Sequence, residues 1–145
     1  MAFQFKMEKI LSIKTKEKEV VQSEYGESVK KFEQLAQSLY ELLKKKEEIE
    51  QHSGNQFKTK MVINEIQQTQ RFLLSLTQQI GSIQTQVQRA REKMNHVHIQ
   101  LLEKTMEVKK IEKMKERQFS VYQQTLTAIE NKQNDEYSVL RYINH

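Results

Sequence analysis

Apolar side chains recur along the chain at alternating spacings of three and four residues. In the second half of the chain this pattern fills nine consecutive positions, namely Leu73, Leu76, Ile80, Ile83, Val87, Ala90, Met94, Val97 and Leu101. In the first half it includes Met7, Leu11, Val21, Tyr25, Phe32, Leu35, Leu39, Leu42 and Ile49, and is interrupted by Lys14, Lys18, Ser28 and Lys46. A repeat of about 3.5 residues is typical of helices that pair along a narrow apolar seam in a left-handed coiled coil.

A turn signal separates the two seams. The segment Gln51–Gln56 contains Gly54-Asn55, the one strong turn dipeptide of the chain, and a glycine can adopt the left-handed conformation that ends a helix. We therefore predict an all-α fold, with a single coiled-coil domain over residues 1–145. A helix of about residues 4–51 and a turn of about 52–59 lead into a longer, antiparallel helix of about 60–142. Pairing around residue 55 sets Met7 opposite Lys104 and leaves about the last 40 residues unpaired.

The seam changes phase within this last part of the chain. Ile111, Lys115, Phe119 and Tyr122 are spaced by four, four and three residues, a stutter that locally unwinds a coiled coil. The apolar positions that continue in the new phase are Leu126, Ile129, Leu140 and Ile143. We expect another protein, or another copy of this chain, to cover them.

The composition supports long helices and excludes several classes of protein. The 145 residues include no proline, three glycines and no cysteine, which excludes disulfides and thiolate zinc sites. The net charge is +5, and basic and acidic residues are intermixed along the chain. Such mixing is typical of solvated helix faces and not of a nucleic-acid-binding surface. Neither a membrane-spanning segment nor a signal peptide is recognisable. We expect a soluble, cytoplasmic protein without a nucleic-acid partner.

The residues with catalytic or metal-binding chemistry are not suitably spaced. His96 and His98 are two residues apart and point in different directions on a helix, whereas metal-binding pairs on helices are three or four residues apart. Glutamates such as Glu47 and Glu48 lie beside lysines, where ion pairing on a wet surface is the default. We predict no enzymatic activity, no metal, no cofactor and no small-molecule substrate.

Two regions are candidate contact surfaces. Residues 66–90 are nearly uncharged and rich in glutamine, and Phe72 and Leu74 lie off the seam there. A neutral surface with an exposed aromatic ring is typical of protein-binding sites, although the same residues can simply widen the apolar core. The aromatic stretch from Phe3 to Ile13 is compatible with a membrane surface, but we favour its packing against the second helix because acidic residues dilute its positive charge.

Several short segments form a recognisable series over nearly the whole chain. In order, they are Phe3-Gln4-Phe5-Lys6, Ile10-Leu11-Ser12-Ile13-Lys14, Glu17 and Glu19, Gln70-Arg71-Phe72, the segment 108–117, and Asp135-Glu136. These segments resemble the flagellar FliJ family. The order and spacing of these segments carry the resemblance.

This resemblance implies a small component of the flagellar type III protein export apparatus, supporting flagellum assembly and motility. Members of the family are antiparallel two-helix coiled coils, similar to the central stalk of F-type ATPases. They bind the hexameric export ATPase and the membrane export gate protein, and they associate with export chaperones. The resemblance therefore implies a cytoplasmic protein peripherally associated with the inner face of the cell membrane at the flagellar base. The end that holds both termini resembles the stalk inserted into the ATPase ring.

The family's gate-binding patch lies on both helices near the turn. Its positions match Leu42, Phe72 and Leu76 in this chain. The neighbouring positions depart from the family's pattern and are Ser38, Lys45, Ile49, Gln79 and Ile83. A second interpretation remains open, in which the protein is a structural coiled coil that assembles with its own copies. The export component should be largely monomeric alone, whereas the structural protein should be a stable oligomer.

Overall fold

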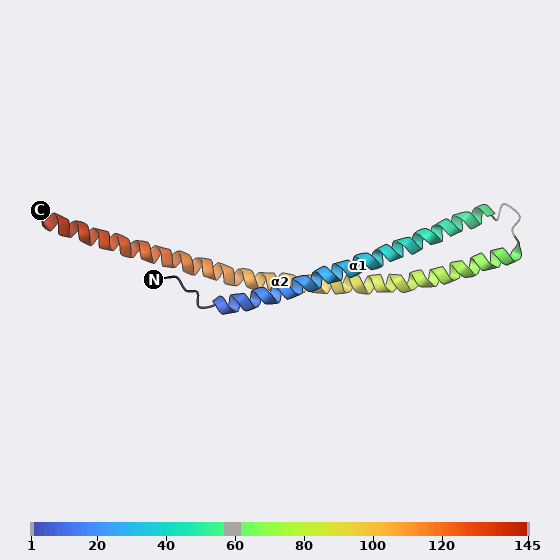
Figure 1. Ribbon diagram of the computed structural model, residues 1–145, viewed down its shortest axis with the longest axis horizontal. Helices are drawn as coiled ribbons and strands as arrows, with labels where there is room; N and C mark the ends of the chain where they lie inside the picture. The colour runs from blue at the N-terminus through green and yellow to red at the C-terminus, as the bar shows by residue number, and fades with distance from the viewer. Residues whose placement is uncertain (1, 57–61, 145) are drawn as a thin grey trace. The chain divides into compact units, whose positions relative to one another are not determined.

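The computed structural model describes residues 2–56 and 62–144 and consists almost entirely of two helices. Helix α1 spans Glu8–Gln56 and helix α2 spans Ile63–Ile143 (Figure 1). Contacts between the helices join early residues of α1 to late residues of α2, so the two run antiparallel. The structure confirms the predicted all-α hairpin with a longer C-terminal helix.

The chain divides into two compact units, each formed from a stretch of both helices. Unit 1 contains Met1–Val20 and Leu102–His145, and unit 2 contains Val21–Leu101. Because each unit pairs its own part of α1 with its own part of α2, the packing within each is described separately.

Unit 2 is built on the uninterrupted seam of α2. Leu76, Ile80, Ala90 and Val97 are its buried apolar residues. The opposing apolar residues of α1 are half-buried, as expected when only two helices cover one another. Ser28 is also buried in this seam, where its Oγ donates a 2.7 Å hydrogen bond to the carbonyl oxygen of Tyr25. This bond satisfies the hydroxyl within its own helix, so α1 keeps its phase through a polar position.

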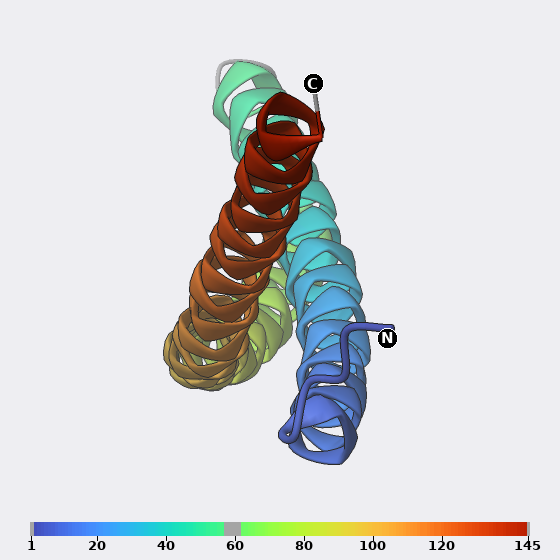
Figure 2. The same cartoon turned by 90° about the vertical axis from the view of Figure 1, so that its left-hand side faces the viewer.

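Unit 1 has a different core, in which the N-terminal residues take part. Residues 2–7 are not helical and lead into α1 (Figure 2). The ring of Phe3 lies 5.2 Å from the ring of Phe119 and 5.5 Å from that of Tyr122, and Phe5 is buried. The contacts of the two phenylalanines therefore favour packing of this segment against α2 over binding to a membrane surface. Since the residues before Glu8 are not helical, α1 begins later than the predicted residue 4.

The helices pair in a different register from the predicted one. The Nζ atom of Lys104 lies 3.1 Å from Oε2 of Glu17, ten residues further along α1 than Met7. The reason is that α1 continues through Gly54 to Gln56, and none of the described glycines has a positive φ. Gly54 thus does not end the helix as predicted, since a helix tolerates glycine at a cost of about 1 kcal/mol. The rest of the predicted turn falls largely on residues 57–61, outside the described residues.

The new register also shortens the unpaired part of α2. The N-terminal segment reaches Phe119 and Tyr122, so the residues up to this point have an intramolecular partner. Every described residue after Tyr122 is exposed. The apolar residues predicted to need a cover, Leu126, Ile129, Leu140 and Ile143, are 39–68% exposed.

Candidate partner-binding site

Phe72 is an exposed aromatic residue near the start of α2 in unit 2. Its side chain is 45% exposed, and Nζ of Lys45 on α1 lies 5.3 Å from the centre of its ring. The lysine thus contacts one face of the ring in a cation–π interaction, worth about 0.5–1 kcal/mol at an exposed site.

Leu42 and Leu76 lie in the seam, one helical turn from this contact. Leu76 is 3% exposed and Leu42 is half-buried. Leu42 precedes Lys45 by three residues, and Leu76 follows Phe72 by four. Because the helices are antiparallel, both leucines lie about one helical turn from the Lys45–Phe72 contact and at the same height along the hairpin. Of the three residues matched to the family's patch, Phe72 therefore offers the most surface to a partner, while Leu76 is buried in the seam.

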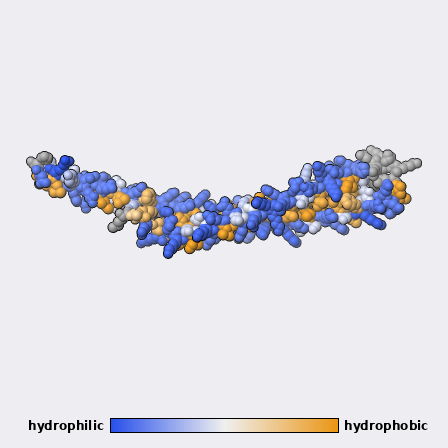
Figure 3. All heavy atoms as spheres, viewed as in Figure 1, coloured by the Kyte–Doolittle hydropathy of each residue, from blue (hydrophilic) through white to orange (hydrophobic). Residues whose placement is uncertain are grey.

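The neighbouring patch positions divide between the edge and the seam of the hairpin. Ser38 and Gln79 are exposed, each seven residues from Lys45 or Phe72 and so on the same edge. Ile49 and Ile83 are half-buried seam residues. Figure 3 shows apolar atoms surfacing among hydrophilic ones toward the end of α1 and the start of α2. The exposed patch positions Ser38, Phe72 and Gln79 are therefore uncharged, Lys45 is charged, and Ile49 and Ile83 belong to the apolar seam.

Lys45 departs from the family's pattern, and the predicted register does not bring it to Phe72, which it contacts in the structure. In the predicted register, Lys45 faces the region of residue 66, six positions away from its true neighbour. The signal that identifies the pair is positional, because Lys45 and Phe72 each precede a seam position by one residue and flank the seam on the same side of an antiparallel pair.

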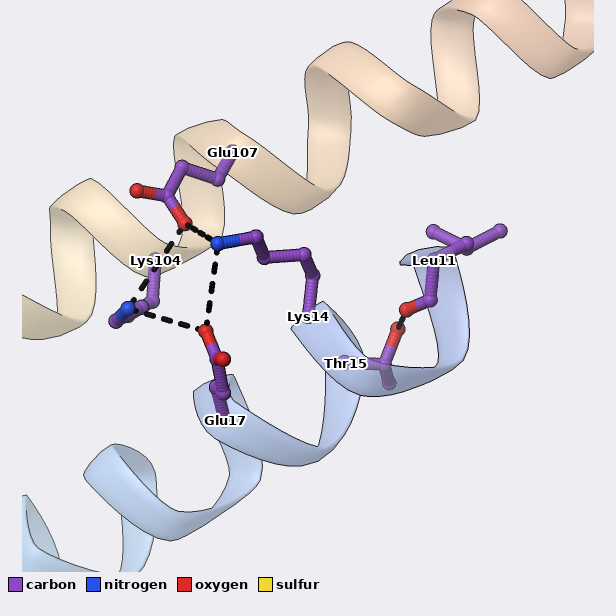
Figure 4. A network of polar contacts seen from close by, with 6 residues as sticks. All are labelled: Leu11, Lys14, Thr15, Glu17, Lys104 and Glu107. Atoms are coloured by element: carbon purple, nitrogen blue, oxygen red, sulfur yellow. Dashed lines mark hydrogen bonds and ion pairs between the residues drawn. The ribbon is translucent and has the colours of Figure 1, made fainter. Parts of the chain in front are cut away.

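Unit 1 carries a network of four charges across the helices (Figure 4). Lys14 lies 3.6 Å from Glu17 and 3.4 Å from Glu107, and Lys104 lies 3.1 Å from Glu17 and 3.9 Å from Glu107. The hydrogen bond from Lys104 lowers the pKa of Glu17 and raises the pKa of Lys104. Lys14 and Lys104 occupy seam positions and pair with carboxylates of both helices. These ion pairs favour the observed register of the two helices within unit 1.

Comparison with known proteins identifies the chain's relatives. Residues 3–145 match the family model described as "Flagellar FliJ protein". The chain belongs to the flagellar FliJ protein family. It is 38% identical over 143 residues to the flagellar FliJ protein of Bacillus subtilis (strain 168), covering 99% of this chain and 97% of that relative. No solved structure matches this chain.

Membership of the FliJ family makes this a flagellar, export-related protein and agrees with its helical hairpin fold. Across the described residues, neither helix contains a stretch long and apolar enough to cross a membrane. Within the same residues, no three side chains of the His, Asp and Glu types form a group that could hold a metal ion. His98 instead packs its ring 5.3 Å from that of Tyr25. The surface around Phe72 is therefore the candidate site for contact with a partner protein.

Proposed function

We propose that this protein is a stalk-like component of the flagellar type III export apparatus. It binds the membrane export gate with the surface around Phe72, binds the export ATPase ring with unit 1, and escorts export chaperones. The observation that carries the proposal is the half-exposed ring of Phe72, which contacts Lys45 and shares its edge of the hairpin with the uncharged, exposed Ser38 and Gln79. Aromatic residues in such surroundings are frequent binding hot spots.

A matched pair of variants tests gate binding. Phe72→Ala should weaken binding to the purified cytoplasmic domain of the export gate by ~2 kcal/mol or more, the usual loss at a hot spot. Leu74→Ala is the control, because Leu74 is 62% exposed and only two residues away. Calorimetric titration gives both affinities. Equal gate affinities for the two variants would refute the assignment of gate binding to Phe72.

Stability measurements on the same variants separate a contact role from a core role. Phe72 is 45% exposed, so truncation should cost only about 1 kcal/mol of folding free energy, roughly half of the burial free energy of a large apolar side chain. A fully packed phenylalanine costs ~3 kcal/mol or more when truncated. A large fall in melting temperature with unchanged gate affinity would assign Phe72 to the core.

Unit 1 supports the proposed contact with the ATPase ring. It holds both termini, and the described residues of α2 after Tyr122 are exposed. Leu140→Asp should weaken ATPase binding while Ser138→Asp, another exposed position, should not. Gate affinity should be unchanged in both variants. Loss of both interactions in Leu140→Asp would indicate general damage to the protein.

The second candidate function is a structural coiled coil that assembles with copies of itself. The exposed apolar residues of α2 after Tyr122 favour it, because a second copy would cover them. Sedimentation equilibrium of the purified full chain distinguishes the two functions. The export component should have the mass of a monomer, whereas a stable dimer or larger assembly would support the structural protein.

A further inference from the structure

Two adjoining hollows open along one edge of unit 2, where small residues occupy the seam. The first has a volume of about 460 Å³ and the second about 420 Å³, and they share Lys31, Ala90 and Lys93. Buried Ser28 and Ala90 contribute to their walls. The hollows exist because these two side chains leave space that a leucine or isoleucine would fill.

The second hollow is lined by cations from both helices. Lys31 of α1 and Arg89 and Lys93 of α2 line it together with Leu35, Gln86 and Ala90, and no acidic side chain lines it. Arg89 and Lys93 are four residues apart and so lie on the same face of α2. Among the residues that the structure describes, none of the three cations has a carboxylate within ion-pair distance.

The acidic residues close in sequence form no ion pair with this cluster among the residues that the structure describes. The segment 66–91 contains no acidic residue. The carboxylate of Glu92 accepts a 3.5 Å hydrogen bond from Gln88, and Glu24 and Glu27 line the first hollow only. Like charges on one helical face disfavour the helix. The three cations therefore lie together without an ion-pair partner among the described residues, in contrast to Lys14 and Lys104 in unit 1, which have carboxylate partners.

We propose that the second hollow binds an acidic segment of a partner protein. Carboxylates of that segment contact Lys31, Arg89 and Lys93, and an apolar side chain between them rests on Leu35 and Ala90. Charge complementarity selects the acidic chemistry, and the apolar wall selects a peptide over a free anion, which has no apolar part to place there. No aromatic side chain lines the hollow, so it lacks the stacking surface typical of single-stranded nucleic-acid sites.

This site is separate from the gate-binding surface and does not depend on the proposed function. The probe is a fluorescein-labelled helical peptide with glutamates flanking a leucine, titrated into the full-length protein and followed by anisotropy. A peptide with glutamine at every glutamate position and inorganic phosphate serve as comparison ligands. The variants are Lys31→Glu and Arg89→Glu, with Lys30→Glu as the matched control because Lys30 is adjacent in sequence but does not line the hollow.

We expect the glutamate peptide to bind saturably and the glutamine peptide not to bind. Lys31→Glu and Arg89→Glu should weaken binding about tenfold or more, and Lys30→Glu should leave it within about twofold. The melting temperatures of Lys31→Glu and Lys30→Glu should be similar, because both side chains are exposed. Loss of binding in Lys31→Glu at an unchanged melting temperature is not expected of a residue with only a structural role.

Four outcomes would overturn the proposal. They are absence of saturable binding, equal binding of the two peptides, equal losses in Lys30→Glu and Lys31→Glu, and displacement of the peptide by phosphate as effectively as by unlabelled peptide. The last outcome would assign the hollow to small anions. Gate binding by Lys31→Glu, measured in parallel, should match that of the unmodified protein, so failure of this proposal leaves the proposed function intact.

Discussion

Ile80 offers the sharpest test of how the two helices pair. It is 5% exposed in the middle of the unit 2 seam, whereas Gln78, two residues earlier, is exposed. Replacing Ile80 by aspartate removes about 1.5–3 kcal/mol of apolar burial and adds the cost of a carboxylate between two helices. Since water reaches the edges of a two-helix seam, we take that second cost at ~2 kcal/mol, the lower end of the range for unpaired polar groups.

The sum for Ile80→Asp is about 4 kcal/mol, a large part of the 5–15 kcal/mol that stabilises a typical domain. A change of 1 kcal/mol shifts the melting temperature of a chain of this size by about 2–4 °C, so we expect a fall of at least ~8 °C. Gln78→Asp should cost less than ~0.5 kcal/mol. Thermal unfolding followed by circular dichroism at helical wavelengths measures both variants.

Measuring the melting temperature of Ile80→Asp at several pH values provides a control for the cost of the buried charge. Protonation of the new carboxyl group removes its charge, so acidification should narrow the difference in melting temperature between Ile80→Asp and Ile80→Asn. Equal melting losses for Ile80→Asp and Gln78→Asp would refute the assigned seam, because they would place both side chains in equivalent surroundings.

Three further results are expected. Gly81→Ala should stabilise the protein by about 1 kcal/mol in urea unfolding, because a Cβ atom there meets nothing within 4 Å and alanine is the better helix former; a loss of stability would show a close neighbour. Glu17 has a lowered pKa in the folded state, mainly through its hydrogen bond from Lys104, so its contribution to stability is complete above its ordinary value of 4.5 and is lost as the pH falls through the folded value. Lys104→Met should therefore lose less stability than the unmodified protein on acidification below that value, and identical acid profiles would contradict this linkage. Phe3→Ala should lower the protection of unit 1 amides from hydrogen exchange by ~1 kcal/mol, the value of an aromatic pair, with no change in unit 2.

The hairpin could be predicted because the apolar period is a property of sequence alone. Both seams contain the predicted residues, and the polar interruptions did not break the helix. Ser28 bonds to its own helix, and Lys14 finds carboxylates on both helices. The partners of these polar side chains are known only once the chain is folded. From the sequence, these positions are recognisable only as interruptions of the apolar repeat.

The register could not be predicted, because it depended on where α1 ends. Gly54 is compatible with either a turn or a helix, and the structure places it in the helix. This moved the neighbours of every α1 residue and concealed the Lys45–Phe72 contact and the cation-lined hollow beside Lys31. The resemblance assigned the candidate patch to residues of both helices, but which of these residues are exposed required the paired structure.

The part of α2 after Tyr122 has a thermodynamic consequence. Its described side chains are exposed, so its helix is stabilised by local interactions alone and lacks the tertiary packing that supplies most helical stability in proteins. It should therefore open in local fluctuations that leave both seams intact, and be the first site of proteolytic cleavage. A partner that covers it must also bear the entropy of fixing it, which lowers affinity for a given contact area and allows rapid release. The same exposed helix thus suits an interaction that forms and dissolves repeatedly better than a permanent assembly.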